Sequence, residues 1–186
     1  MPMDEILLTC EEKMESAVAY LREELRGVRT GRASAGLVDH IKVDYYGSPT
    51  DLRQLASIAV PEPTMIMIKP FDPSSLKDIE KAILAANVGM TPMVDGKLIR
   101  LNVPALSTER REQMAAQVRK MGESTRVAIR NARRDANKVI DREQKEGVIA
   151  EDDAQRGKDD VQDLTKTYEG IVTEILDAKT EELMEV

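Results

Sequence analysis

The residues whose type and spacing best suit a chemical task are four arginines, Arg119, Arg126, Arg130 and Arg133. They lie in a stretch, residues 107–145, that has no proline and one glycine, which predicts a single long helix. At about 100° per residue the four side chains fall within roughly 60° of each other. The guanidinium group forms forked hydrogen bonds with phosphate oxygens. This arginine stripe therefore predicts a surface that binds nucleic-acid phosphates.

An alternative interpretation of the arginine stripe is a solvated helix face, whose arginines pair with acids such as Glu123 and Asp135. The distribution of charge favours phosphate binding. The whole chain has a formal net charge of −7, yet residues 106–146 carry 11 basic and 7 acidic side chains, and residues 147–186 carry 4 and 12. One basic helix in an acidic chain indicates contact with a polyanion along one edge and repulsion elsewhere.

The sequence contains no catalytic constellation. The single histidine, His40, is expected to be an exposed strand residue. Residues 89–97 have the wrong spacing for a phosphate-binding loop, and Leu98 stands where that loop requires Ser or Thr. The acids at 151–153 are explained as a helix start rather than a calcium site. We therefore expect no enzyme activity, no catalytic residue, no metal site and no cofactor.

Composition excludes further classes of protein. The single cysteine, Cys10, rules out an internal disulfide framework, and it is typical of the reducing cytosol. No apolar run approaches the roughly 18 residues of a membrane span. The acidic residues 1–15 resemble neither a secretory signal nor a transit peptide. We expect a cytoplasmic protein without a membrane partner, in which Cys10 is a small buried side chain rather than a nucleophile.

Apolar residues at steps of three and four predict three long helices. The first covers 3–28 and ends at Gly31, the second covers 107–145, and the third covers about 151–183. The predicted seam of the first helix consists of Met3, Leu7, Cys10, Met14, Ala17, Leu21, Leu25 and Val28. Because no one helix could bury its stripe alone, the three are expected to form a bundle.

Between the first two helices the pattern changes. Period-two or apolar stretches predict strands at 37–45, 56–60 and 64–69, a short helix follows Asp72, and a hairpin surrounds Asp95 and Gly96. The predicted fold class is therefore α+β. Residues 1–30 and 106–186 form a long three-helix bundle, and residues 31–105 form an inserted small α/β domain of β-α-β type.

The insert is joined to the bundle by two short linkers, which makes the junction a predicted hinge. The hinge residues are Thr30, Gly31, Arg32, Ala33 and Ser34 in one linker and Val103, Pro104 and Ala105 in the other. Small residues in the first linker and a proline in the second predict a junction that bends but does not swivel freely.

Five motifs resemble one known family. They are 28–34 (VRTGRAS), 44–50 (DYYGSPT), 52–57 (LRQLAS), 126–137 (RVAIRNARRDAN) and 159–165 (DDVQDLT). They run through the whole chain in the same order as in the bacterial ribosome recycling factors, which they closely resemble. The resemblance implies a three-helix bundle joined by a hinge to an α/β domain, with an L-shaped outline of transfer-RNA size.

The resemblance also implies a function. The protein would bind the large subunit of the post-termination ribosome. With elongation factor G and GTP it would split the ribosome into subunits, releasing messenger RNA and deacylated transfer RNA, and it would act as a monomer. The matching arginines would contact large-subunit, 23S-type ribosomal RNA: Arg29, Arg32, Arg130, Arg133 and Arg134, joined by Arg119 and Arg126 of the arginine stripe.

A helical adaptor is the competing class of protein. Its partner surface would be the acidic first and third helices, and it would explain the apolar seams and the lack of catalytic groups equally well. It would not explain the alignment of the arginines. Salt separates the two classes, because binding through about four phosphates weakens steeply as the salt concentration rises.

Overall fold

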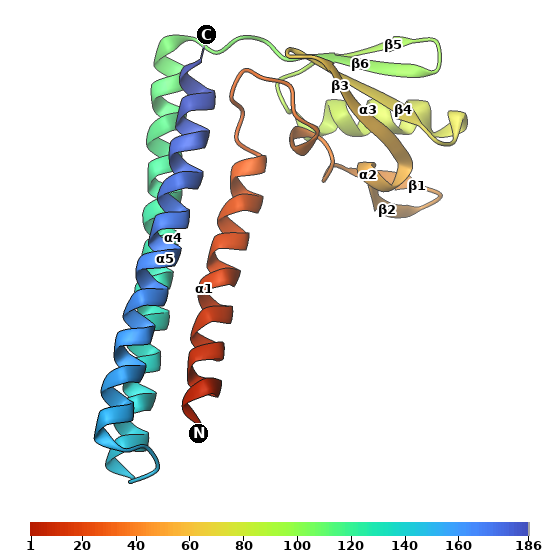
Figure 1. Cartoon of the computed structure of the whole chain (residues 1–186). Coiled ribbons are helices and arrows are strands. Elements are labelled where there is room, and N and C mark those ends of the chain that lie inside the picture. Colours follow the sequence, from red (N-terminus) through yellow and green to blue (C-terminus); the bar gives the residue numbers. More distant parts are fainter. Residues whose placement is uncertain (186) are drawn as a thin grey trace. The chain divides into compact units, whose positions relative to one another are not determined.

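The computed structural model describes residues 1–185 (Figure 1). The chain divides into two compact units, one of Met1–Leu25 with Ala115–Val186 and the other of Arg26–Met114. Val186, the last residue of the predicted bundle domain, lies outside the described residues. One unit is built of long helices and the other contains an antiparallel sheet. The predicted α+β class is confirmed.

The helical unit is formed by α1 (Met3–Arg26), α4 (Thr108–Lys145) and α5 (Glu151–Met184). Figure 1 shows α1 and α5 running in one direction and α4 in the other. Packing contacts tie the helices together: the Cys10 thiol donates to the Ala132 carbonyl at 3.7 Å, and Lys158 pairs with Asp141 at 2.6 Å. Within the described residues the helical unit is therefore a three-helix bundle.

The predicted seams form part of the bundle core, with shifts in all three helices. In α5, Val161 and Leu176 are buried, but the predicted Leu164 and Ile175 are only half-buried. In α1, Ile6 and Val18 are buried, whereas the predicted Leu7 and Ala17 are only half-buried. In α4 the seam includes a glycine, Gly122. The buried residues of α4 are Ala115, Val118, Gly122, Thr125, Ile129, Ala132, Ala136, Ile140 and Glu143. The predicted start of α4 is also confirmed, because the Ser107 hydroxyl accepts a hydrogen bond from the Arg110 amide at 3.2 Å.

The predicted end of the first helix is wrong. α1 stops at Arg26, directly before Gly27, and not at Gly31. Tertiary contacts at Arg26 explain the early stop: its guanidinium pairs with Asp39, and Gly36 packs so closely that a Cβ there would lie 3.0 Å from the Arg26 carbonyl oxygen. Gly27 adds its low helix propensity. Val28 is buried, but it lies beyond the helix.

The second unit contains a two-stranded hairpin and a four-stranded antiparallel sheet of order β3-β4-β6-β5. Strand β4 runs parallel to β5, is joined to it by α3 and is separated from it by β6, which is the predicted β-α-β arrangement. The elements are η1 (Ala35–Leu37), β1 (Lys42–Tyr45), β2 (Ser48–Asp51), α2 (Leu52–Leu55), β3 (Ala56–Glu62), β4 (Met65–Pro70), η2 (Pro73–Ser75), α3 (Leu76–Ala86), β5 (Pro92–Asp95) and β6 (Leu98–Asn102).

The core of this unit lies between the sheet and α3. Ile66 and Ile68 of β4, with Ile99 of β6, are fully buried, and so are Ile79 and Ile83 of α3. The helix was predicted from the three-four spacing along α3, and the strand from the apolar run at 64–69, which does not itself show which side chains of β4 are buried.

The predicted strand at 37–45 is wrong in its first half. Residues 35–37 form a 3₁₀ turn, residues 38–40 form a further turn, and the strand begins only at Lys42. His40 is exposed as predicted, but it lies in this turn. The reason is burial: Leu37, Val38 and Asp39 are all buried, and three consecutive buried side chains cannot belong to a strand with one solvent-facing side.

Candidate nucleic-acid interface

Three of the four arginines in the stripe, Arg126, Arg130 and Arg133, lie on the side of α4 that meets α5. The Arg126 guanidinium donates to the Thr173 hydroxyl at 2.8 Å, and Arg133 donates to the Gln162 side-chain oxygen at 3.1 Å. Arg130 pairs with an acid of its own helix and approaches Glu169 of α5 at 3.9 Å. These three arginines are half-buried. They hold α4 against α5 and present only part of each guanidinium to solvent.

The alternative interpretation, in which the arginines of the stripe pair with nearby acids on a solvated helix face, is correct for Arg130. Its partner in α4 is Glu123, the acid that the interpretation named. Asp135, the other acid, instead pairs with Lys13 of α1 at 3.5 Å. Glu123 and Asp135 of central α4 thus each have a cationic partner within the bundle, through ion pairs that are exposed and therefore weak.

The remaining two predicted arginines of α4, Arg119 and Arg134, are exposed. Neither makes a hydrogen bond or ion pair with any part of the chain that the structure describes. Both guanidinium groups are therefore available to an external anion.

Two lysines extend this exposed set, and the sequence-based prediction missed them. Lys120 and Lys138 are exposed, and at about 100° per residue they lie within roughly 40° of Arg134 on the outer face of α4. Within residues 1–185 neither has an ion-pair partner. We call Lys120, Arg134 and Lys138 the outward basic row. Their spacing in the sequence places these lysines on the same face as Arg134, but the prediction considered arginines alone.

Arg29 and Arg32 belong to the other compact unit, residues Arg26–Met114. Arg32 is exposed. Arg29 is half-buried, donates to the Pro104 carbonyl at 3.1 Å, and packs where a Cβ on Gly89 would lie 2.8 Å from its Nη1. Arg29, the residue just before the first predicted hinge segment, is therefore tied to Pro104 of the second, as well as offering charge.

All eight predicted hinge residues lie inside the Arg26–Met114 unit. Several are fastened to that unit: the Ala33 amide donates to the Pro63 carbonyl at 2.7 Å, and the Val103 amide donates to the Thr64 carbonyl at 2.8 Å. Ser34 caps the η1 turn by accepting from the Gly36 amide. The hinge stays a prediction.

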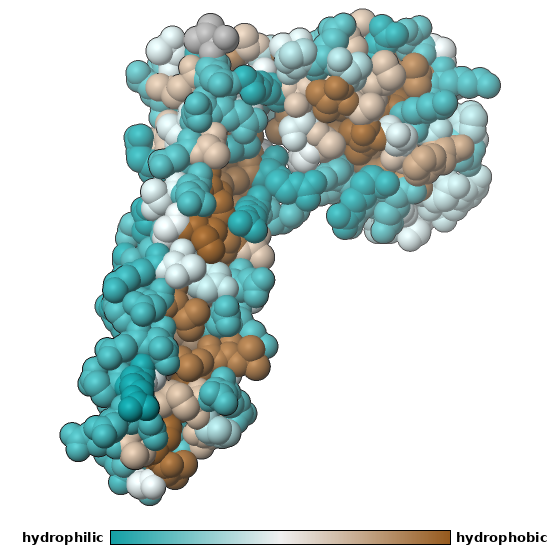
Figure 2. Space-filling model, viewed as in Figure 1, coloured by the Kyte–Doolittle hydropathy of each residue, from teal (hydrophilic) through white to brown (hydrophobic). Residues whose placement is uncertain are grey.

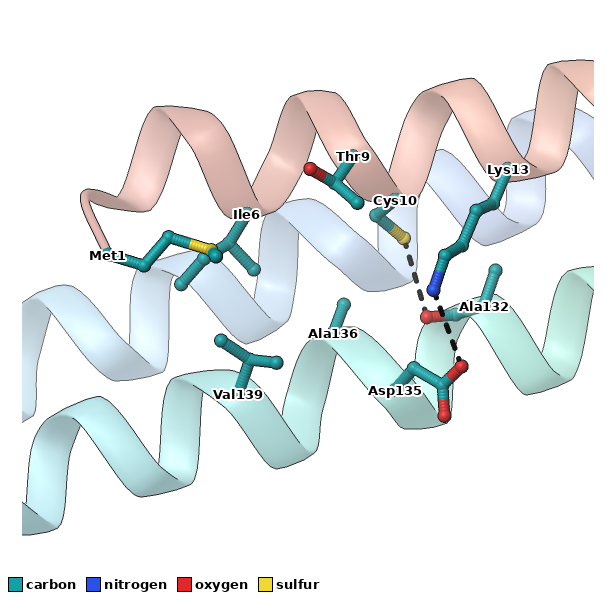
Figure 3. Close-up of a pocket in the computed structure, with 9 residues that line it drawn as sticks. All are labelled: Met1, Ile6, Thr9, Cys10, Lys13, Ala132, Asp135, Ala136 and Val139. Atoms are coloured by element: carbon teal, nitrogen blue, oxygen red, sulfur yellow. Dashed lines mark hydrogen bonds and ion pairs between the residues drawn. The ribbon is translucent and has the colours of Figure 1, made fainter.

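Figure 3 shows a cavity of about 90 Å³ between α1 and α4, beside the single cysteine. The Cys10 side chain points toward Ala132, and the Lys13–Asp135 ion pair lies next to it. Burial raises the pKa of the Cys10 thiol, an effect that Lys13 partly offsets. A protonated, buried thiol is a poor nucleophile, and this surrounding agrees with Cys10 as a packed side chain of the bundle.

We expect Cys10 to react with the thiol reagent DTNB about a hundredfold more slowly in the native protein than in protein unfolded by urea. The cause is the 2% exposure of the residue and the suppressed thiolate. Leu8→Cys in a Cys10→Ala background is the matched control, because Leu8 is 56% exposed on the same helix and should react as a free thiol. Equal rates for the two cysteines would contradict the expectation.

The described residues hold no candidate metal cluster and no candidate membrane span. No group of three or more His, Cys, Asp or Glu side chains within residues 1–185 could hold a metal ion. No helix in this part of the chain is long and apolar enough to cross a membrane.

Comparison with known proteins gives a consistent result. The family model described as ribosome recycling factor matches residues 21–184. The ribosome-recycling factor of Oleidesulfovibrio alaskensis is 49% identical over 184 residues, covering 99% of this chain and 100% of the relative. That of Staphylococcus carnosus is 46% identical, with the same coverage.

Solved structures agree. A solution structure of the ribosome recycling factor is 38% identical with a TM-score of 0.81, covering 99% of this chain and 98% of that one. A second solved structure contains models for the T. thermophilus ribosome recycling factor and the E. coli elongation factor G bound to the E. coli post-termination complex. The matched chain is 33% identical to this one with a TM-score of 0.72, and the match covers 100% of this chain and 100% of that chain. Sequence and fold lead to one conclusion: the chain belongs to the ribosome recycling factor family.

Proposed function

We propose that this protein is a non-catalytic, cytoplasmic translation factor that binds the post-termination ribosome. With elongation factor G and GTP it splits the ribosome into subunits and releases messenger RNA and deacylated transfer RNA. Membership of the family supports the proposal, and so does the related structure in which recycling factor and elongation factor G occupy a post-termination complex.

We assign the contact with large-subunit ribosomal RNA to α4. The observation that carries this assignment is the outward basic row, Lys120, Arg134 and Lys138, together with exposed Arg119. These cations lack acidic partners in the described structure, whereas the acids of central α4 are paired within the bundle. Folded RNA is recognised mainly through its shape and its phosphates, and a row of exposed cations on a straight helix suits that task.

The half-buried arginines of the stripe support this row in the proposal. Arg126 and Arg133 use one N–H group each on α5, and a guanidinium has five, so further donors remain for phosphate. Arg29 and Arg32 supply charge from the other unit. A hinge at residues 30–34 and 103–105 would let elongation factor G move that unit while the bundle stays on the RNA.

The test is light scattering by purified post-termination ribosomes. We expect scattering to fall only when this protein, elongation factor G and GTP are all present, because subunits scatter less than whole ribosomes. Reactions that omit each component in turn are the controls. Unchanged scattering in the complete reaction, with a species-matched elongation factor and folded protein, would overturn the proposal and favour the adaptor class.

A further inference from the structure

The proposed RNA contact leaves the most acidic part of the molecule unused. Residues 3–15 of α1 carry five acidic side chains and one basic, and residues 151–163 of α5 carry six acidic and two basic. These two segments together have a net charge of −8, whereas the whole chain has −7. Since α1 and α5 run side by side in the same direction, the two acidic segments lie at the same end of the bundle (Figure 1).

A groove runs between these segments. One part, of about 370 Å³, is lined by Leu7, Glu11, Asp160, Asp163, Leu164 and Thr167. A second part, of about 330 Å³, lies beside the start of α5, and its lining includes Met3, Val148, Asp153, Arg156 and Asp160. The two hollows share Asp160 in their linings, and we call them together the α1–α5 groove.

The groove has an apolar floor. Leu7 and Leu164 are half-buried, and Val148, at one end, is 58% exposed. Figure 2 shows hydrophobic side chains along the bundle face where α1 and α5 lie side by side, bordered by hydrophilic ones. An apolar strip with a polar border on a folded domain is typical of an interaction site.

The border is acidic and only partly neutralised. Asp163 pairs with Lys166 at 3.3 Å and Asp153 with Arg156 at 3.7 Å, but both pairs are exposed and therefore weak. Asp160 has no ion-pair partner among residues 1–185.

Glu11, on the α1 rim of the groove, has no ion-pair partner in the part of the chain that the structure describes. It accepts a hydrogen bond from the Tyr168 hydroxyl, whose pKa is raised by burial and by the nearby Glu11 and Glu15 carboxylates. The negative potential therefore spans both walls of the groove.

We propose that the α1–α5 groove binds a protein segment rich in lysine or arginine that carries aliphatic side chains between its charges. The acidic walls repel nucleic-acid phosphate and attract such a segment, and the apolar floor requires more than charge. The α5 side of the groove, residues 150–167, is roughly 25 Å long, which accommodates about eight extended residues. This inference is independent of the RNA contact proposed for α4.

The test uses the full chain and a fluorescein-labelled peptide of alternating lysine and leucine, about eight residues long. Binding is followed by fluorescence anisotropy. Glu11→Lys with Asp160→Lys is expected to weaken binding about tenfold or more, because it places like charge against the peptide. The matched control is Glu174→Lys with Asp177→Lys, the same change of charge at exposed α5 positions outside the groove, which should change affinity less than about threefold.

A lysine–serine peptide of equal length and charge tests the apolar floor, and we expect it to bind about tenfold more weakly. Equal weakening by the groove and control variants, or equal affinity for the two peptides, would overturn the proposal, since either would mean general attraction of charge. Amide chemical shifts of the wild-type protein decide the matter without substitutions: shifts at Leu7, Asp160 and Leu164 support the groove, and shifts confined to other surfaces refute it.

Discussion

Replacing Arg134 and Lys138 by glutamate is expected to raise the Kd for the large ribosomal subunit about a hundredfold at about 0.1 M salt. Both side chains are exposed on the outer face of α4 and unpaired in the described structure, so each can meet a phosphate and neither supports the fold. Each lost phosphate contact should also reduce the slope of log K against log salt by about one. The measurement is binding to labelled subunits over a series of salt concentrations.

The control for this pair is Arg22→Glu with Lys166→Glu. It makes the same change of charge at exposed positions on α1 and α5 of the same bundle. We expect its Kd to change less than about threefold, with an unaltered salt slope. If the two pairs weakened binding equally, net charge rather than the outer face of α4 would determine affinity, and the assignment of that face would be wrong.

Alanine at Arg130 and Arg133 is a less specific test. These side chains contact Glu169 and Gln162 of α5 as well as facing solvent. Their removal is expected to lower the melting temperature and the RNA affinity together, whereas the Arg134 and Lys138 pair should lower the affinity alone. Thermal unfolding followed by circular dichroism separates the two effects.

The sequence could predict which cations share a face of α4, but not which of them contact α5. The spacing of Arg119, Arg126 and Arg130 placed them on one face of α4, and the structure has them there. Spacing along α4 cannot show that Thr173 and Gln162 of α5 lie opposite arginines of the stripe. That depends on the axial register of α5 against α4 in the packed bundle. Which cations remain free is a property of packing.

The fold was predictable where burial follows one period. The α4 and α5 seams and the hairpin at β5 and β6 are of this kind, since a helix or a strand with one buried face shows its own repeat in the sequence. Residues 37–41 are different. Polarity alternates only from Ile41 onward, and Leu37, Val38 and Asp39 are all buried among other elements, with Asp39 paired to Arg26. Contacts distant in sequence override the local pattern there.

A second large effect is expected at Gly122, in the middle of α4. Gly122→Ala should lower the melting temperature by roughly 5 °C, corresponding to about 1–2 kcal/mol. A Cβ at this buried position would overlap the Leu176 side chain of α5, with Cδ2 at 2.8 Å and Cγ at 2.9 Å. Because Leu176 is itself 7% exposed, it has little room to move away. The clash should exceed the gain in helix propensity of about 1 kcal/mol.

Gly170→Ala is the matched control. Gly170 also lies inside a long helix, α5, but it is exposed and a Cβ there would meet nothing within 4 Å. Only helix propensity changes, so this variant should be more stable by up to about 1 kcal/mol. If Gly122→Ala stabilised the protein as much as Gly170→Ala does, α4 and α5 could not approach as closely at Leu176 as the structure has them.

A double-mutant cycle identifies the partner in the clash. Leu176→Ala alone removes a buried side chain and should cost about 2–5 kcal/mol. In the double variant the new methyl group at 122 enters space that Leu176 has vacated. The loss should therefore be smaller than the sum of the two single losses, with a coupling of about 1 kcal/mol. Strict additivity would mean that Gly122 is required for a reason other than the Leu176 side chain. A loss smaller than the sum would mean that the missing side chain at Gly122 makes room for Leu176 of α5. This glycine would then set the distance between α5 and α4, the helix that presents the outward basic row.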